Sequence, residues 1–129
     1  ALEVGSLVPA HASALGKALL AHHAYVLPEL GAAPLASYTP ATVTDIKVLT
    51  RELEEIRQLG WASEVGELFP GIASLAAPIE DRRGVIAGAI GISGPIERLW
   101  KGRRPRPELV ADVMQSARTV SRELGAIPW

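Results

Sequence analysis

The sequence has 129 residues, 48% of them hydrophobic, which is enough for one domain with a packed core and excludes a disordered chain. Its net charge of −1 argues against direct binding of nucleic acid, because DNA-binding domains present a basic face. The chain has no cysteine, which excludes disulfides and thiolate metal sites, and no apolar run approaches the roughly 18 residues that span a membrane.

The N-terminal part of the sequence predicts a strand followed by a helix. Residues 2–8 have strand character, and because the chain starts at Ala1 rather than at methionine, we interpret residues 1–129 as one domain that is incomplete at its N-terminal side. The sequence has neither a secretory signal nor a cysteine, so we expect a cytoplasmic protein. Apolar positions at three- to four-residue spacing predict a helix over residues 12–23. Gly16 weakens this helix by about 1 kcal/mol relative to alanine, which indicates that a ligand or a packed segment approaches its backbone.

The remaining elements predict a sheet with helices around it. Three prolines make residues 27–40 a connector with one short helical turn. The next helix is expected over residues 45–59, with Thr44 as its N-cap and Gly60 as the glycine that ends it. The rest should contain, in order, a strand over 61–65, a loop over 66–71, strands over 72–79 and 85–93 with a turn at 81–84, a basic linker over 101–107, and a helix over 108–124. This order predicts an α+β fold, with a mostly antiparallel sheet and helices packed on one face.

The hairpin over residues 72–93 has two unlike faces. When Ile79 is paired with Ile86, alternation along the strands places bulky residues on the face that should pack against helices. The other face carries mostly small residues, namely Ile72, Ser74, Ala76, Pro78, Val85, Ala87, Ala89, Gly91 and Ser93. Protein interiors do not tolerate the void that such a face would leave. Either a pocket for a small molecule or a closely packed helix should fill this space, and we favour the pocket.

Known catalytic signatures are absent from the sequence. The run Gly91-Ile92-Ser93-Gly94 lacks one residue of a nucleophile elbow, and Gly16-Lys17 lacks the preceding glycine of a phosphate-binding loop. His22 and His23 point to different faces of a helix, so they cannot share a metal ion as residues four apart would. We therefore expect no enzyme, no cofactor and no metal site. The alternative is a hydrolase or lyase that uses Ser93 or His11.

Several short motifs resemble, in their order and spacing, the effector-binding domain of IclR-family transcription regulators. They are Pro9-Ala10-His11-Ala12-Ser13 and its continuation to Leu20, Tyr38-Thr39-Pro40, Leu59-Gly60-Trp61, Pro70-Gly71-Ile72 and Ile92-Ser93-Gly94-Pro95. The resemblance implies a GAF-like fold that binds a small effector, such as a carboxylate or an aromatic acid. It also implies that the effector controls DNA binding by a separate N-terminal domain, with no contact between this chain and DNA or a membrane.

The resemblance further implies which residues bind the effector. The helix start from Ser13 to Gly16 would offer backbone N–H groups to an anion, as helix N-termini do. Glu64 falls where the family often has an acidic residue, commonly aspartate. The other implied positions lie on the small-residue face of the hairpin. The complete set of ligand-binding residues is Ser13, Ala14, Leu15, Gly16, Glu64, Ile72, Ser74, Ala89, Gly91 and Ser93.

Large apolar residues near the C-terminus and beside the linker suggest self-association. Trp100, Ile127 and Trp129 are expected to be exposed, which predicts a homo-oligomer, either a dimer or a tetramer. A further alternative is a purely structural oligomerisation domain, whose small-residue face would pack against a protein partner.

Overall fold

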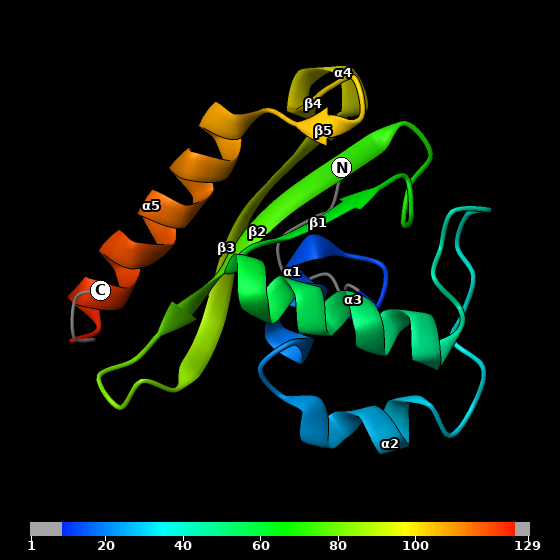
Figure 1. The fold of residues 1–129 in the computed structure, drawn as a ribbon, viewed down its shortest axis with the longest axis horizontal. Coiled ribbons are helices and arrows are strands. Elements are labelled where there is room, and N and C mark those ends of the chain that lie inside the picture. The colour runs from blue at the N-terminus through cyan, green and yellow to red at the C-terminus, as the bar shows by residue number, and fades with distance from the viewer. Residues whose placement is uncertain (1–8, 126–129) are drawn as a thin grey trace.

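The computed structural model describes residues 9–125, so the strand expected over residues 2–8 lies outside the described part, as do Ile127 and Trp129. Its centre is a three-stranded antiparallel sheet in the order β1 (Ala62–Val65), β2 (Ile72–Glu80) and β3 (Ile86–Pro95). Helices cover both faces of this sheet, as Figure 1 shows. The predicted α+β class with an antiparallel sheet is confirmed, but the helices are not confined to one face.

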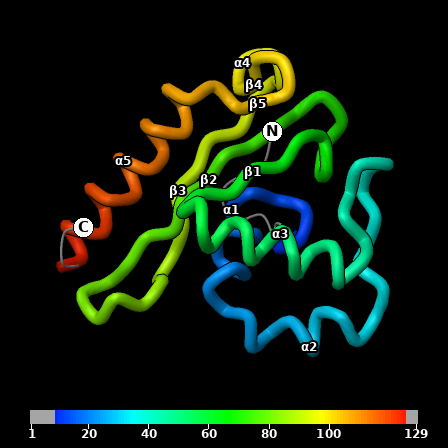
Figure 2. The backbone as a smooth tube through the Cα atoms, viewed as in Figure 1, coloured from blue at the N-terminus to red at the C-terminus, as the bar shows by residue number. Residues whose placement is uncertain are grey.

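One face of the sheet is covered by α1 (Ala14–Leu20) and α3 (Ile46–Leu59). Between them the connector forms a 3₁₀ turn at Ala24–Val26 and the short helix α2 (Leu27–Leu30), which can be followed along the chain in Figure 2. The buried core on this side consists of Ala14, Ala18, Leu20, Ala21, Leu35, Leu49, Leu53, Ile56, Ala62 and Ala76. Two alanines of the sheet are therefore sealed by helices rather than by a ligand.

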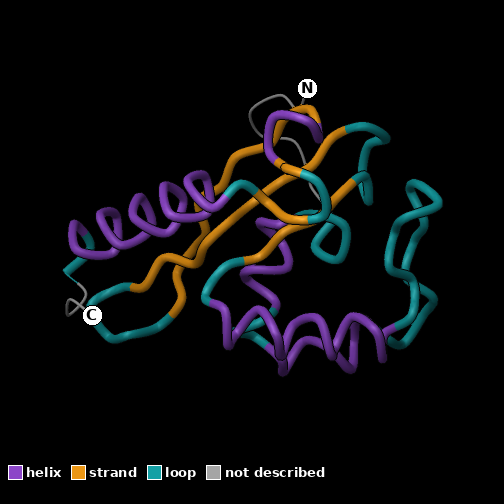
Figure 3. Tube along the Cα trace, turned by 45° about the horizontal axis from the view of Figure 1, so that its top comes forward, coloured by secondary structure: helices purple, strands orange, loops and turns teal. Residues whose placement is uncertain are grey.

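The opposite face of the sheet packs against α5 (Pro107–Glu123), on the other side from α3 in the view of Figure 3. A second core forms there from Ala73, Leu75, Ala77, Leu99, Val113 and Ala117. The segment before α5, predicted as a linker, contains regular structure. The short helix α4 (Ile96–Leu99) comes first, and an antiparallel hairpin of β4 (Trp100–Lys101) and β5 (Arg104–Pro105) follows it. Trp100 is half-buried against the second core, so the expectation that it is exposed is wrong.

The ends of α3 show how local residues set the helix boundaries. Asp45, not Thr44, is the N-cap, because the Asp45 backbone is extended and its side chain accepts a hydrogen bond from the Lys47 N–H at 2.8 Å. Gly60 ends the helix as predicted, with a left-handed φ of 83° that glycine adopts without steric cost.

The pairing of β2 with β3 differs from the predicted register by two residues. Ile79 pairs with Gly88 rather than with Ile86, and a bulge follows between Ile79 and Glu80. A shift of one residue would exchange the two faces of a strand, whereas a shift of two preserves them. The small-residue face therefore forms as predicted, with Ser74 opposite Ser93 and Ala76 opposite Gly91.

The far end of β2 extends beyond β1, which pairs only with residues 73–76. Pro78 lies in this extension and has no N–H to offer to a further strand. Two residues on, the N–H of Glu80 donates to Oγ of Ser121 at 3.0 Å. Ser121 is fully buried in α5, so the helix closes this part of the strand.

Candidate functional site

A cavity of about 450 Å³ lies on the small-residue face, beside the part of that face that α1 covers. Its walls come from the start of α1, from β1, from the loop over residues 66–71, and from β2 and β3 where Ile72 pairs with Pro95. The lining residues are Ser13, Ala14, Leu15, Glu64, Leu68, Phe69, Ile72, Ser74, Leu75, Gly91, Ile92, Ser93 and Gly94. Both alternatives for the small-residue face are therefore present, since a helix packs on one part of it and a cavity lies over another.

The cavity brings together all but two of the ten residues implied as ligand-binding. Gly16 is not among its lining residues. The side of Gly16 to which a Cβ would project is occupied by the backbone of Ala10, whose atoms would lie 2.4 Å from that Cβ. This glycine lets residues 9–13 pack closely against α1, which is the packing interpretation of its helix-weakening effect. Ala89 is also absent from the lining, since it packs against the core beneath α1.

Polar groups at the start of α1 satisfy one another. Oγ of Ser13 accepts a hydrogen bond from the Gly16 N–H at 3.1 Å and donates to the Pro9 carbonyl at 3.0 Å. The Ala14 N–H donates to Oγ of Ser74 at 3.3 Å. The helix start therefore touches Ser74 directly.

Glu64 is the buried acidic group of the cavity wall, with a relative exposure of 5%. Its Oε1 accepts a hydrogen bond from Oγ of Ser74 at 2.8 Å, and its Oε2 accepts one from the Glu67 N–H at 2.9 Å. Burial raises the pKa of Glu64, although these two hydrogen bonds and the charge of Lys17 act in the opposite direction. The carboxyl group is thus held in place by β2 and by the loop that follows β1.

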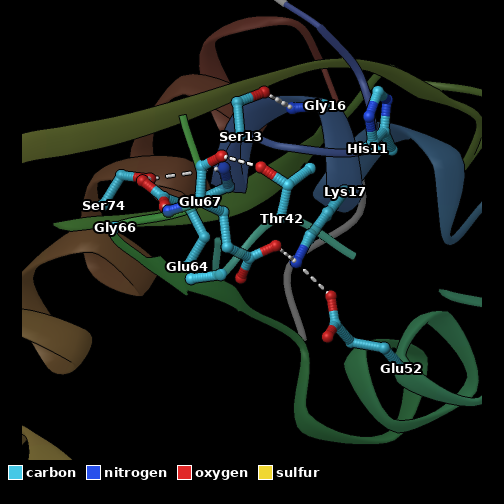
Figure 4. Close-up of polar contacts among 12 residues, drawn as sticks. His11, Ser13, Gly16, Lys17, Thr42, Glu52, Glu64, Gly66, Glu67 and Ser74 are labelled. Atoms are coloured by element: carbon cyan, nitrogen blue, oxygen red, sulfur yellow. Dashed lines mark hydrogen bonds and ion pairs between the residues drawn. The ribbon is translucent and has the colours of Figure 1, made fainter. Parts of the chain in front are cut away.

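Lys17 forms a buried ion cluster behind this network, which Figure 4 shows. Its ammonium is fully buried, lies 2.7 Å from Oε1 of Glu67, and also pairs with Glu52 of α3. That Glu52 oxygen has no other polar partner among residues 9–125. Burial raises the pKa of Glu67, and the charge of Lys17 opposes this increase. Sequence reasoning missed this cluster, and its only local signal is a lysine between the buried residues Ala14 and Ala18 of α1.

The loop that carries Leu68 and Phe69 is attached to the connector before α3. Oγ1 of Thr42 donates to the Glu67 carbonyl at 2.5 Å, and Oγ1 of Thr39 donates to the Gly66 carbonyl at 2.5 Å. Hydrogen bonds to two successive carbonyls, those of Gly66 and Glu67, therefore fix the loop that carries the apolar part of the cavity wall.

The residues named for an alternative enzyme are not arranged as a catalytic pair. Nε2 of His11 lies 2.7 Å from the Ala36 carbonyl, and His11 is absent from the lining of the cavity that contains Ser93. Within residues 9–125, no group of three or more His, Asp or Glu side chains is positioned to hold a metal ion. No helix in this part of the chain is long and apolar enough to cross a membrane.

Known proteins resemble this chain in sequence and in fold. It is 45% identical over 125 residues to the glycerol operon regulatory protein of Streptomyces coelicolor, a match that covers 97% of this chain and 49% of that protein. The IclR structure of Thermotoga maritima is 32% identical, with a TM-score of 0.79 and coverage of 95% of this chain and 50% of that chain. The inducer-binding domain of Acinetobacter PobR, solved as a double mutant with 3-hydroxybenzoic acid, is 25% identical, with a TM-score of 0.75 and coverage of 95% and 68%.

These matches agree with the family to which the sequence is assigned. The chain spans about half the length of the S. coelicolor relative. Residues 1–122 match the family described as bacterial transcriptional regulator IclR C-terminal, so the predicted regulatory rather than enzymatic class is confirmed. This chain belongs to the IclR family of bacterial transcriptional regulators and represents the C-terminal domain of that family.

Proposed function

We propose that this chain is the effector-sensing domain of an IclR-type regulator, and that the cavity between α1, the 66–71 loop and the hairpin binds the effector. The observation that supports this most strongly is the combination of a 450 Å³ cavity with mostly apolar walls and a few placed polar groups. Pockets of this kind suit small organic molecules. The family resemblance suggests a carboxylate or an aromatic acid, and a related inducer-binding domain was solved with 3-hydroxybenzoic acid.

Effector binding would control DNA binding by a separate N-terminal domain, in a cytoplasmic homo-oligomer. The signal need only shift the balance between two arrangements of the oligomer, for which a coupling of about 1–3 kcal/mol is sufficient. The Glu64–Glu67–Lys17–Glu52 contacts provide a physical connection from the cavity wall to α3. An effector that displaces Glu64 would therefore act on the position of α3.

Isothermal titration of this chain with small acids, aromatic acids and alcohols tests the proposal. We expect at least one compound to bind with a Kd on the order of micromolar to millimolar. Ser93→Ala, in the cavity wall, should weaken that binding, whereas Ser116→Ala, on the exposed side of α5, should leave it unchanged. A ligand that binds equally well to both variants and to Ile72→Trp, which should fill the cavity, would show that the site lies elsewhere.

A further inference from the structure

The side of α5 that is turned away from the sheet carries its charges in a symmetric order. Five polar residues share this side because they follow one another at intervals of three or four, and we call them the outer face of α5. They are Glu108, Asp112, Gln115, Arg118 and Arg122. The acids occupy the first half of the helix and the arginines the second half. Gln115 lies at the centre, with an acid and an arginine at equal distances before and after it.

This order of charges is unfavourable within a single chain. Glu108 and Asp112 are four residues apart, as are Arg118 and Arg122, and like charges at this spacing destabilise a helix. None of these four residues takes part in an ion pair within residues 9–125. The helix dipole favours acids in the first turn and bases in the last, but Asp112 and Arg118 lie more than one turn from the helix ends. The chain itself therefore leaves these charges uncompensated.

An apolar groove lies beside the outer face of α5. It has a volume of about 890 Å³ and is bounded by α5, by the end of α3 and by β5. Three residues of the outer face are among its lining residues, and so are Leu59, Trp61 and Met114. Leu59 is exposed, and the other two side chains are half-buried. Apolar and aromatic side chains surrounded by charged ones are typical of the surfaces through which proteins associate.

We propose that the outer face of α5 and the groove beside it form an interface between two copies of this chain, with their α5 helices antiparallel about a two-fold axis at Gln115. A two-fold axis places a surface against itself, so residues at equal distances on either side of the axis meet. Asp112 then lies opposite Arg118 of the second copy, and Glu108 lies opposite Arg122 of the second copy. Each copy thus supplies the counter-charges that the other lacks. This inference rests on the homo-oligomer of the proposed function and adds the surface through which it forms.

Charge reversal tests this arrangement with the whole chain in solution. The wild type should be a dimer in sedimentation equilibrium at low salt. Asp112→Arg should raise the Kd of the dimer at least about tenfold, because an arginine then faces Arg118 of the second copy on both sides of the axis. Arg118→Asp should have the same effect through two facing acids. Either change replaces a like-charge pair within the helix by an opposite-charge pair, so neither should weaken the helix itself.

An equimolar mixture of the two variants distinguishes this interface from a general effect of charge. In a mixed dimer every altered charge again faces its opposite, so the mixture should associate with a Kd within about threefold of the wild-type value. A chain that carries both changes should also recover. Glu54→Arg is the matched control, because it changes the net charge as Asp112→Arg does, at an exposed position of α3 outside the groove. It should leave the Kd unchanged.

The possible failures separate this interface from the proposed function. An oligomer that neither single variant weakens, or variants that do not recover when mixed although circular dichroism shows them to be folded, would reject the interface and leave the homo-oligomer in place. A monomeric wild type would reject both the interface and the homo-oligomer. Effector binding is measured separately by titration calorimetry, so it stands or falls on its own result.

Discussion

Glu64 shows at the scale of one residue how one carboxyl group can hold the structure together and also line the proposed effector cavity. Its carboxyl group joins the loop after β1 to β2 through two hydrogen bonds, and it also lines the cavity. Hydrogen bonds to a charged group each contribute roughly 1.5–3 kcal/mol, which offsets part of the cost of burying the charge. The carboxyl group is therefore held in one orientation in the wall of the cavity.

The raised pKa of Glu64 predicts how the stability of the protein depends on pH. Because burial favours the protonated carboxyl, the folded state binds this proton more readily than the unfolded state does. The resulting stabilisation is complete below the ordinary pKa of about 4.3 and is lost as the pH rises through the raised value. Relative to that of Glu64→Gln, the unfolding free energy of the wild type should therefore decrease as the pH is raised from about 4 to about 7. Urea denaturation of both proteins across this range measures the change. A difference that does not change with pH would contradict this assignment.

Gly91 illustrates a residue whose missing side chain is essential. A Cβ at this position would lie 2.5 Å from the Leu75 carbonyl oxygen and 3.0 Å from Cβ of Ala76, so neighbouring backbone would have to move. We expect Gly91→Ala to lower the unfolding free energy by about 1–3 kcal/mol. Gly88→Ala is a control in the same strand, because a Cβ there meets no atom within 4 Å. Thermal or urea denaturation should show that Gly88→Ala is neutral or stabilising, and equal losses for the two variants would refute the steric explanation.

At the scale of elements, Lys17 joins parts of the chain that no strand pairing connects. Its ammonium lies between Glu52 of α3 and Glu67 of the loop after β1. Buried ion pairs cost desolvation energy, so such a cluster is weak evidence for stability in itself. What it provides is a defined position of α1 relative to α3 and to the wall of the cavity.

Removal of Lys17 should nevertheless be strongly destabilising, because it leaves two carboxylates without their counter-ion. We expect Lys17→Met to lower the unfolding free energy by about 3–5 kcal/mol in urea denaturation. A second change, Glu67→Gln, in the same chain should restore part of this loss, since one of the uncompensated charges is then removed. Lys47→Met, at an exposed position of α3, should change stability by no more than about 0.5 kcal/mol. Equal effects of Lys17→Met and Lys47→Met would show that the cluster is not formed in solution.

The molecule as a whole has three layers, with α1 and α3 on one face of the sheet and α5 on the other. The cavity lies on the α1 side of the sheet, and of its lining residues Leu75 also belongs to the core beneath α5. An effector in this cavity should slow amide hydrogen exchange in residues 66–71 by about tenfold or more, because bound segments open less often. Exchange in α5 should remain unchanged in the same mass-spectrometric experiment. Protection that is strongest in α5 would place the ligand on the wrong side of the sheet.

The elements and faces that follow from local patterns could be predicted from the sequence, whereas contacts between distant residues could not. The 3.6-residue period predicted α3 and α5, and strand alternation predicted the small-residue face with Ser74 and Ser93. The register was wrong by two residues because the bulge after Ile79 leaves no signal in the turn. Lys17 and Glu67 are 50 residues apart, so their ion pair could not be read from sequence spacing.

The far end of β2 has a consequence for how molecules of this protein meet at high concentration. Pro78 has no backbone N–H to donate there, and the N–H of Glu80, the next one on the same edge, is already bonded to Oγ of Ser121. A β-strand of another molecule would therefore find two successive ladder positions closed, so edge-to-edge aggregation is disfavoured along this stretch. The combined change of Pro78→Val and Ser121→Ala should increase self-association in sedimentation experiments, and an unchanged distribution would refute this role. The proline thus protects the solubility of a strand that extends past its neighbour.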